Sequence, residues 1–117
     1  MSHLLFILND QPYGSERSYN ALRLASAVAK REGQQLKLFL IGDAASCAKA
    51  EQRVPAGYYN VESMLHSLAR PGGEIGICGT CLDARGIAEK ELVDGTRRST
   101  LDELADWTLW ADRVLVF

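Results

Sequence analysis

The sequence has little of what several common classes of protein require. Only three of its 117 residues are cysteine, an odd number that argues against the disulfide framework of small secreted proteins. Lysine and arginine total 13 against 15 acidic residues, so we expect neither a nucleic acid nor an anionic membrane as a partner. The apolar run at residues 4–8 is far shorter than a signal-peptide core or a membrane span. We therefore expect a cytoplasmic protein.

The remaining composition is that of an ordinary globular domain. Hydrophobic residues make up 47% of the chain and charged residues 24%, a typical balance for a protein with one packed core. A chain of 117 residues is too short for two such cores, so we expect a single domain spanning residues 1–117. Neither a GxGxxG nor a Walker pattern follows any predicted strand, and no nucleotide cofactor is expected.

Apolar segments alternate with segments of helical periodicity along the chain. Buried strands are predicted at residues 4–8, 36–41, 74–78 and 112–117. Helices are predicted from Ser15 to about Gly33, from Tyr58 until Pro71-Gly72-Gly73, and after the capping box Thr100–Glu103. Asn60 is the candidate cap of the second of these helices. Residues 92–99 are compatible with a short strand or with a turn. This alternation predicts an α/β fold, a three-layer α/β/α sandwich on a parallel sheet of four to five strands.

The strands of a parallel sheet end at one shared edge, and ligands bind outside it. Three predicted loops lie there, at residues 9–15, 42–47 and 78–81. From the first two, we take as candidate binding residues those that could line a small anion or thiol pocket: Tyr13, Gly14, Ser15, Glu16 and Asp43. Ser15 and Asp43 are also expected to cap the helices that follow them, which is the more ordinary role for these residue types.

The third loop holds the most informative motif, Cys78-Gly79-Thr80-Cys81. The thiolate is the reactive form of cysteine, and a helix N-terminus or a nearby cation stabilises it. If a helix begins near Cys78, Cys81 and Arg85 follow at i+3 and i+7 on the same face. Gly79 limits crowding and Thr80 offers a hydroxyl, so that a sulfur compound can reach Cys78. We therefore take these five residues as the candidate reactive site.

Several chemistries are compatible with two thiols at this spacing. Persulfide transfer needs one exposed nucleophile, and dithiol oxidoreduction needs both thiols. A thioredoxin-type dithiol faces a later cis-proline, whereas all three prolines precede Cys78. A zinc site would need further ligands from Cys47, His3 or His66, and we expect no bound metal. Two buried cysteines that only fill space are the remaining interpretation.

The whole chain resembles the DsrE/DsrF-like sulfur-relay family, and most closely its YchN-like branch. The resemblance lies in matching segments at fixed offsets, which are Pro12–Glu16, Leu22–Ala25, Leu38–Leu40, Asp43–Ala44, Cys78–Ile87, Asp94–Gly95, Glu103–Ala105 and Trp107–Leu109. It implies a parallel five-stranded sheet between helices and assembly into trimers or hexamers. In the relay members it also implies a cysteine after the third strand that carries persulfide sulfur between partner proteins.

Cys78 matches the position of that cysteine, while Cys81 goes beyond the single-cysteine relay pattern. The leading hypothesis is a homo-oligomeric sulfur carrier or sulfurtransferase with donor and acceptor proteins as partners. A non-catalytic binding or scaffold protein and a Cys78/Cys81 dithiol redox protein are the alternatives. Trp107 and Trp110 lie at i and i+3 on the last predicted helix, and we expect one of them to be buried only in the oligomer.

Overall fold

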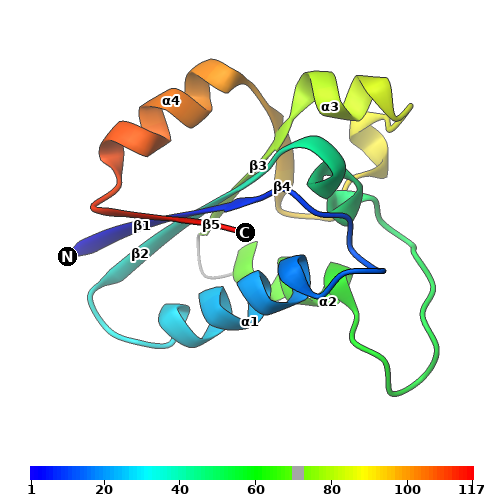
Figure 1. Ribbon diagram of the computed structural model, residues 1–117, viewed down its shortest axis with the longest axis horizontal. Coiled ribbons are helices and arrows are strands. Elements are labelled where there is room, and N and C mark those ends of the chain that lie inside the picture. The colour runs from blue at the N-terminus through cyan, green and yellow to red at the C-terminus, as the bar shows by residue number, and fades with distance from the viewer. Residues whose placement is uncertain (70–72) are drawn as a thin grey trace.

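The computed structural model of the chain describes residues 1–69 and 73–117 (Figure 1). Within these residues, one sheet of five parallel strands has the order β4-β3-β2-β1-β5. The strands are β1 (Ser2–Leu8), β2 (Gln34–Leu40), β3 (Glu74–Cys78), β4 (Thr96–Ser99) and β5 (Arg113–Val116). The predicted α/β fold on a parallel sheet is confirmed, and β4 lies in the segment whose structure the sequence left undecided.

Helices cover both faces of the sheet. They are α1 (Arg17–Ala29), η1 (Gly42–Ala48), α2 (Val61–Ala69), α3 (Gly79–Ala84), η2 (Glu89–Glu91) and α4 (Leu101–Trp110), where η denotes a 3₁₀ helix. Figure 1 shows α1 and α2 below the sheet and α4 above it. The predicted end of the second long helix at Pro71-Gly72 lies outside the described residues. Among the helices that the structure does describe, none is both long enough and apolar enough to cross a membrane.

The continuous apolar run of β1 is buried on both faces, as the sequence predicts. Successive side chains of a strand point to opposite faces, so Phe6 packs in the cluster below the sheet while Leu5 packs above it with Phe39 and Trp107. The connection from β4 to β5 passes from one edge of the sheet to the other, and its right-handed course places α4 on the upper face. The two cores therefore differ in size, the upper one being small.

Two predicted helix caps are confirmed and two are not. Asn60 accepts the N–H of Ser63 at 3.0 Å, and Thr100 accepts that of Glu103 at 3.1 Å. The cap position of α1 is Glu16, which makes no side-chain cap bond. Asp43 lies inside the first turn of η1, which also has no side-chain cap. Ser15 does accept the Arg17 N–H at 3.2 Å, so part of the expected role is retained at α1.

The two tryptophans of α4 differ in how far the single chain buries them. Trp107 is only 4% exposed and meets Phe39 edge to face. Trp110 is half-buried and stacks on His3 with ring centroids 4.4 Å apart. Trp107 is therefore buried within the single chain, and the expectation that one tryptophan is buried only in the oligomer stays a prediction for Trp110. The exposed apolar residues of this helix are Leu101 and Leu109, 70% and 86% exposed.

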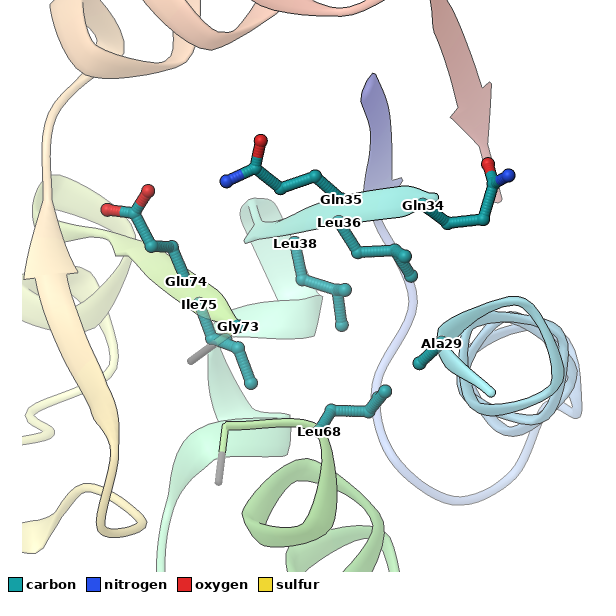
Figure 2. Close-up of a pocket in the computed structure, with 9 residues that line it drawn as sticks. All are labelled: Ala29, Gln34, Gln35, Leu36, Leu38, Leu68, Gly73, Glu74 and Ile75. Carbon is teal, nitrogen blue, oxygen red and sulfur yellow. The ribbon is translucent and has the colours of Figure 1, made fainter. Parts of the chain in front are cut away.

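A pocket of about 160 Å³ with a mixed polar and apolar lining lies at the amino ends of β2 and β3 (Figure 2). The side chains of Ala29, Leu36, Leu68 and Ile75 point toward one another around it, whereas that of Glu74 points away (Figure 2). Cys78 ends β3 at the opposite edge of the sheet. The chemistry of the cysteine pair is thus separate from this pocket, although pockets of this kind are the usual first candidates for ligand binding.

Candidate functional site

The turn from β3 into α3 fixes the position of the cysteine pair. Ile77 is fully buried and anchors the end of β3, while Leu82 anchors α3 to the same core. The helix ends in a Schellman motif, in which Gly86 N–H bonds to Asp83 O at 3.1 Å and Ile87 N–H to Leu82 O at 3.0 Å. Gly86 adopts φ +65°, a conformation that favours glycine. Both ends of this six-residue helix are therefore fixed.

The two thiols are in direct contact. Cys81 Sγ donates a hydrogen bond to Cys78 Sγ across 2.7 Å, and Thr80 Oγ1 lies 3.3 Å from Cys78 Sγ. Behind the pair, the backbone N–H of Gly42 donates to Cys81 Sγ at 3.2 Å. Gly42 has φ +59°, so its left-handed conformation aims this N–H at the thiol. The loops after β2 and β3 are thus joined at Cys81, as their shared edge predicts.

The environment gives the two thiols opposite acidities. Partial burial raises the pKa of Cys78, but hydrogen bonds from the Cys81 thiol, the Thr80 hydroxyl and the backbone of both residues outweigh it, so the net pKa is lowered. The pKa of Cys81 is raised by burial and by its hydrogen bond to Cys78. Cys78 is therefore the more acidic thiol of the pair, and the Cys81 thiol is the hydrogen-bond donor that favours its ionised form.

Arg85 contacts Cys81 rather than Cys78. The helix ends before it, so the predicted common helical face of three residues does not form. Instead the guanidinium folds back, with Nη1 donating to Cys81 O at 3.0 Å and Nη2 pairing with Asp43 Oδ1 at 2.5 Å. Its charge opposes the rise in the pKa of Cys81. Asp43, expected as a cap or a binding residue, thus holds Arg85 in place.

A second arginine, which the sequence did not single out, lies beside the nucleophile. Arg98 projects from β4, and its Nη1 and Nη2 donate to Asp83 Oδ1 and Oδ2 at 2.8 and 2.9 Å. A Cβ on Gly79 would lie 2.8 Å from Arg98 Nε, so the guanidinium rests against the bare backbone there. Arg98 follows Cys78 by twenty residues within the undecided segment, and only the pairing of β4 with β3 brings it close.

The loop after β1 makes different contacts. Tyr13 Oη accepts the N–H of Val61 at 3.1 Å and thereby caps α2, while Ser15 Oγ donates to Asp10 at 2.8 Å. Gly14 has φ +97° in the same loop, and Glu16 precedes α1. Within residues 1–69 and 73–117, no hydrogen bond or ion pair links residues 13–16 to the cysteine pair. Their role in binding stays a prediction.

The third cysteine is isolated from the pair. Cys47 is 1% exposed and donates to Asp10 O at 3.4 Å. Burial raises the pKa of its thiol to about 12. In the described part of the chain, no group of three or more His, Cys, Asp or Glu side chains is arranged to hold a metal ion, so the zinc candidates Cys47, His3 and His66 do not converge there.

Comparisons with known proteins agree with this architecture. The chain is 42% identical to Protein YchN of Escherichia coli over 118 aligned residues, covering all of both chains. It is 35% identical to an uncharacterized protein of Methanopyrus kandleri, covering 95% of this chain and 90% of that one. The crystal structure of the E. coli YchN protein superposes with a TM-score of 0.93 over both full chains at 42% identity.

A protein of unknown function from Methanobacterium thermoautotrophicum shares the fold, with a TM-score of 0.77 and full coverage of both chains at 12% identity. Residues 2–117 match the DsrE/DsrF-like family over nearly the whole sequence. These matches lead to one conclusion. The chain belongs to the DsrE/DsrF-like family.

Proposed function

We propose that this protein is a cytoplasmic, homo-oligomeric sulfur carrier that receives and passes on persulfide sulfur at Cys78. The observation that carries the proposal is the direct contact of two thiols with opposite pKa shifts. A sulfur carrier needs one thiolate at neutral pH that is partly open to solvent. Cys78 is suited to this role, since its pKa is lowered and it is neither fully buried nor paired in a disulfide.

The hydrogen bonds to the Cys78 sulfur act in both steps of the transfer. In the first step, the Cys78 thiolate attacks the outer sulfur of a donor persulfide, a new S–S bond forms, and the donor leaves as a thiolate. In the second step, an acceptor thiolate attacks the outer sulfur now held on Cys78, whose own sulfur leaves as a thiolate. Hydrogen bonds that lower the pKa of Cys78 also stabilise it as this leaving group.

Assembly with further copies of the chain is supported by apolar side chains on the thinly covered face of the sheet. Leu101 and Leu109 on α4 and Val114 and Val116 on β5 are all exposed. Apolar patches of this kind are typical of protein–protein contacts. We propose that these side chains form the contact between copies. Donor and acceptor proteins then approach the edge of the sheet at the carboxyl ends of the strands, where Cys78 lies.

The direct test is to incubate the protein with a cysteine desulfurase and cysteine and to measure its intact mass. Wild type is expected to gain one sulfur atom and Cys78→Ala none, while Cys81→Ala keeps the adduct. Cys47→Ala is the matched control and should behave as wild type, because Cys47 is buried. An adduct that is lost in Cys81→Ala but kept in Cys78→Ala would contradict the assignment of the nucleophile.

The 2.7 Å separation of the two sulfurs also favours a second candidate, a dithiol redox protein. In that case Cys81 attacks a mixed disulfide on Cys78, and a Cys78–Cys81 disulfide forms while the partner leaves as a thiol. Mild oxidation with a disulfide reagent would then remove the two thiol hydrogens without adding sulfur. Both cysteines would be required for turnover, whereas the carrier function requires Cys78 alone.

A further inference from the structure

Arg98 lies where it can act on whatever approaches Cys78. It is carried on β4, whose pairing with β3 brings Ser99 level with Cys78. Its guanidinium rests against Gly79, the residue that follows the nucleophile. The pKa of Arg98 is raised first by Asp83 and also by the charge of Cys78. The cation and the thiolate are therefore near enough to interact.

The guanidinium also has N–H groups available to bind a ligand. Two of its five N–H groups bond to Asp83, and within the described ranges the other three make no hydrogen bond. The side chain is 41% exposed, so a solute can reach it. Asp83 orients the guanidinium through a bidentate pair. Because the side chain is already held in place, binding a further anion costs it less conformational freedom.

We propose that Arg98 selects anionic sulfur compounds as the reactants of Cys78, in particular low-molecular-weight persulfides that carry carboxylates. This inference rests on the proposed sulfur-carrier function. In the reaction, Cys78 thiolate attacks the outer sulfur of R–S–SH, the S–S bond breaks, and R–S⁻ departs with the electron pair. Arg98 holds the carboxylate of R while this exchange occurs.

The first experiment measures charge selectivity without any sulfur transfer. Iodoacetate and iodoacetamide differ little in size and differ in charge, and both alkylate the same thiolate. The rate constants at Cys78 are measured separately by fragment mass spectrometry, and their ratio cancels any change in the fraction of thiolate. We expect Arg98→Gln to lower the iodoacetate-to-iodoacetamide ratio by about threefold, a modest effect because the carboxylates of Asp83 and Glu89 offset part of the attraction.

Two variants serve as controls. Arg31→Gln removes the same charge just beyond the C-terminal end of α1 and should leave the ratio unchanged. Arg98→Lys keeps the charge and should restore most of the selectivity. High salt should lower the ratio in wild type itself, which tests the inference without any substitution. A ratio that is equal in wild type and Arg98→Gln, and that does not respond to salt, would overturn the inference.

The second experiment uses two sulfur donors that share the same reacting persulfide and differ in the charge of their carboxyl groups. Glutathione persulfide is compared with its diethyl ester, and the sulfur adduct on Cys78 is followed over time. Arg98→Gln should slow the reaction with the charged donor and leave that with the ester unchanged. Equal slowing with both donors would contradict selection by charge. If neither donor modifies Cys78 although the alkylation ratio depends on Arg98, the sulfur-carrier function fails and the anion preference stands.

Discussion

Cys47 and Cys78 occupy the same rim of the sheet and have opposite chemical properties. Cys47 is packed inside η1 with its thiol directed at Asp10 O, and its pKa is raised to about 12. Cys78 ends β3, is partly exposed, and has a lowered pKa. The two residues are chemically identical before folding. The difference is produced by burial in one case and by hydrogen-bond donors around the sulfur in the other.

This contrast shows why position along a strand decides the function of a cysteine. Cys47 belongs to the apolar face of a helix, where neighbouring alanines exclude water. Cys78 stands where the chain changes from strand to helix, so that backbone N–H groups and the side chains of Thr80 and Cys81 can face its sulfur. A thiol in the first environment fills space, and a thiol in the second can react.

The largest expected difference is in alkylation. At pH 7 a thiol of pKa 12 is ionised to about one part in 10⁵, and it is also inaccessible. We expect iodoacetamide to modify Cys78 at least about 1000-fold faster than Cys47 in the folded protein, as measured by peptide mass spectrometry. In the denatured chain the two rates should be similar. Comparable rates in the folded state would remove the contrast.

The second difference concerns stability, for which Cys47 is expected to matter more than Cys78. Cys47→Ala removes a buried sulfur and its hydrogen bond to Asp10, and should lower the free energy of unfolding by about 1–2 kcal/mol. Cys78→Ala should change it by less than about 0.5 kcal/mol. Urea unfolding of the two variants measures both values. A larger loss for Cys78→Ala would mean that this residue is mainly structural.

The smallest expected effect is on the pH dependence of Cys78 alkylation, and it tests which groups lower the pKa of Cys78. The alkylation rate of Cys78 should rise with pH and level off at a lower pH than for an unperturbed thiol, because its pKa is lowered. Thr80→Val and Cys81→Ala each remove a donor to the thiolate, so each should move the midpoint to higher pH. At pH 7 the rate should fall only by about twofold to fivefold, since a more basic thiolate is also more nucleophilic. Unchanged pH profiles in both variants would show that these side chains do not set the pKa.

Most of the fold could be predicted from local patterns, and one strand could not. The runs around Phe6, Phe39 and Ile77 are apolar enough to predict buried strands, and Asn60 and Thr100 are recognisable caps. Residues 96–99 contain two arginines and no apolar alternation. They form a strand because their backbone pairs with β3 at the edge of the sheet, and no local pattern reports such a pairing.

The same distinction applies to the site. Cys78 and Cys81 are close because a three-residue spacing brings them together, so their contact follows from the motif itself. Arg85 and Asp43 were both recognised as candidates, but their ion pair joins residues 42 positions apart and depends on the fold. Arg98 was missed because it belongs to β4. Non-local contacts therefore supply the charges of the site, and the local motif supplies its sulfur atoms.

The route from β4 to β5 across the whole sheet also affects how the chain folds. Leu4 pairs with Arg113 over 109 positions, whereas Ser2 pairs with Gln34 over 32. Closing the longer loop costs about 1 kcal/mol more chain entropy than closing the shorter one. We expect β5 to dock late in folding, because such long-range pairings are slow to form. The strands next to the cysteine pair and Arg98, β3 and β4, can thus pair and form the site before β5 joins the opposite edge of the sheet.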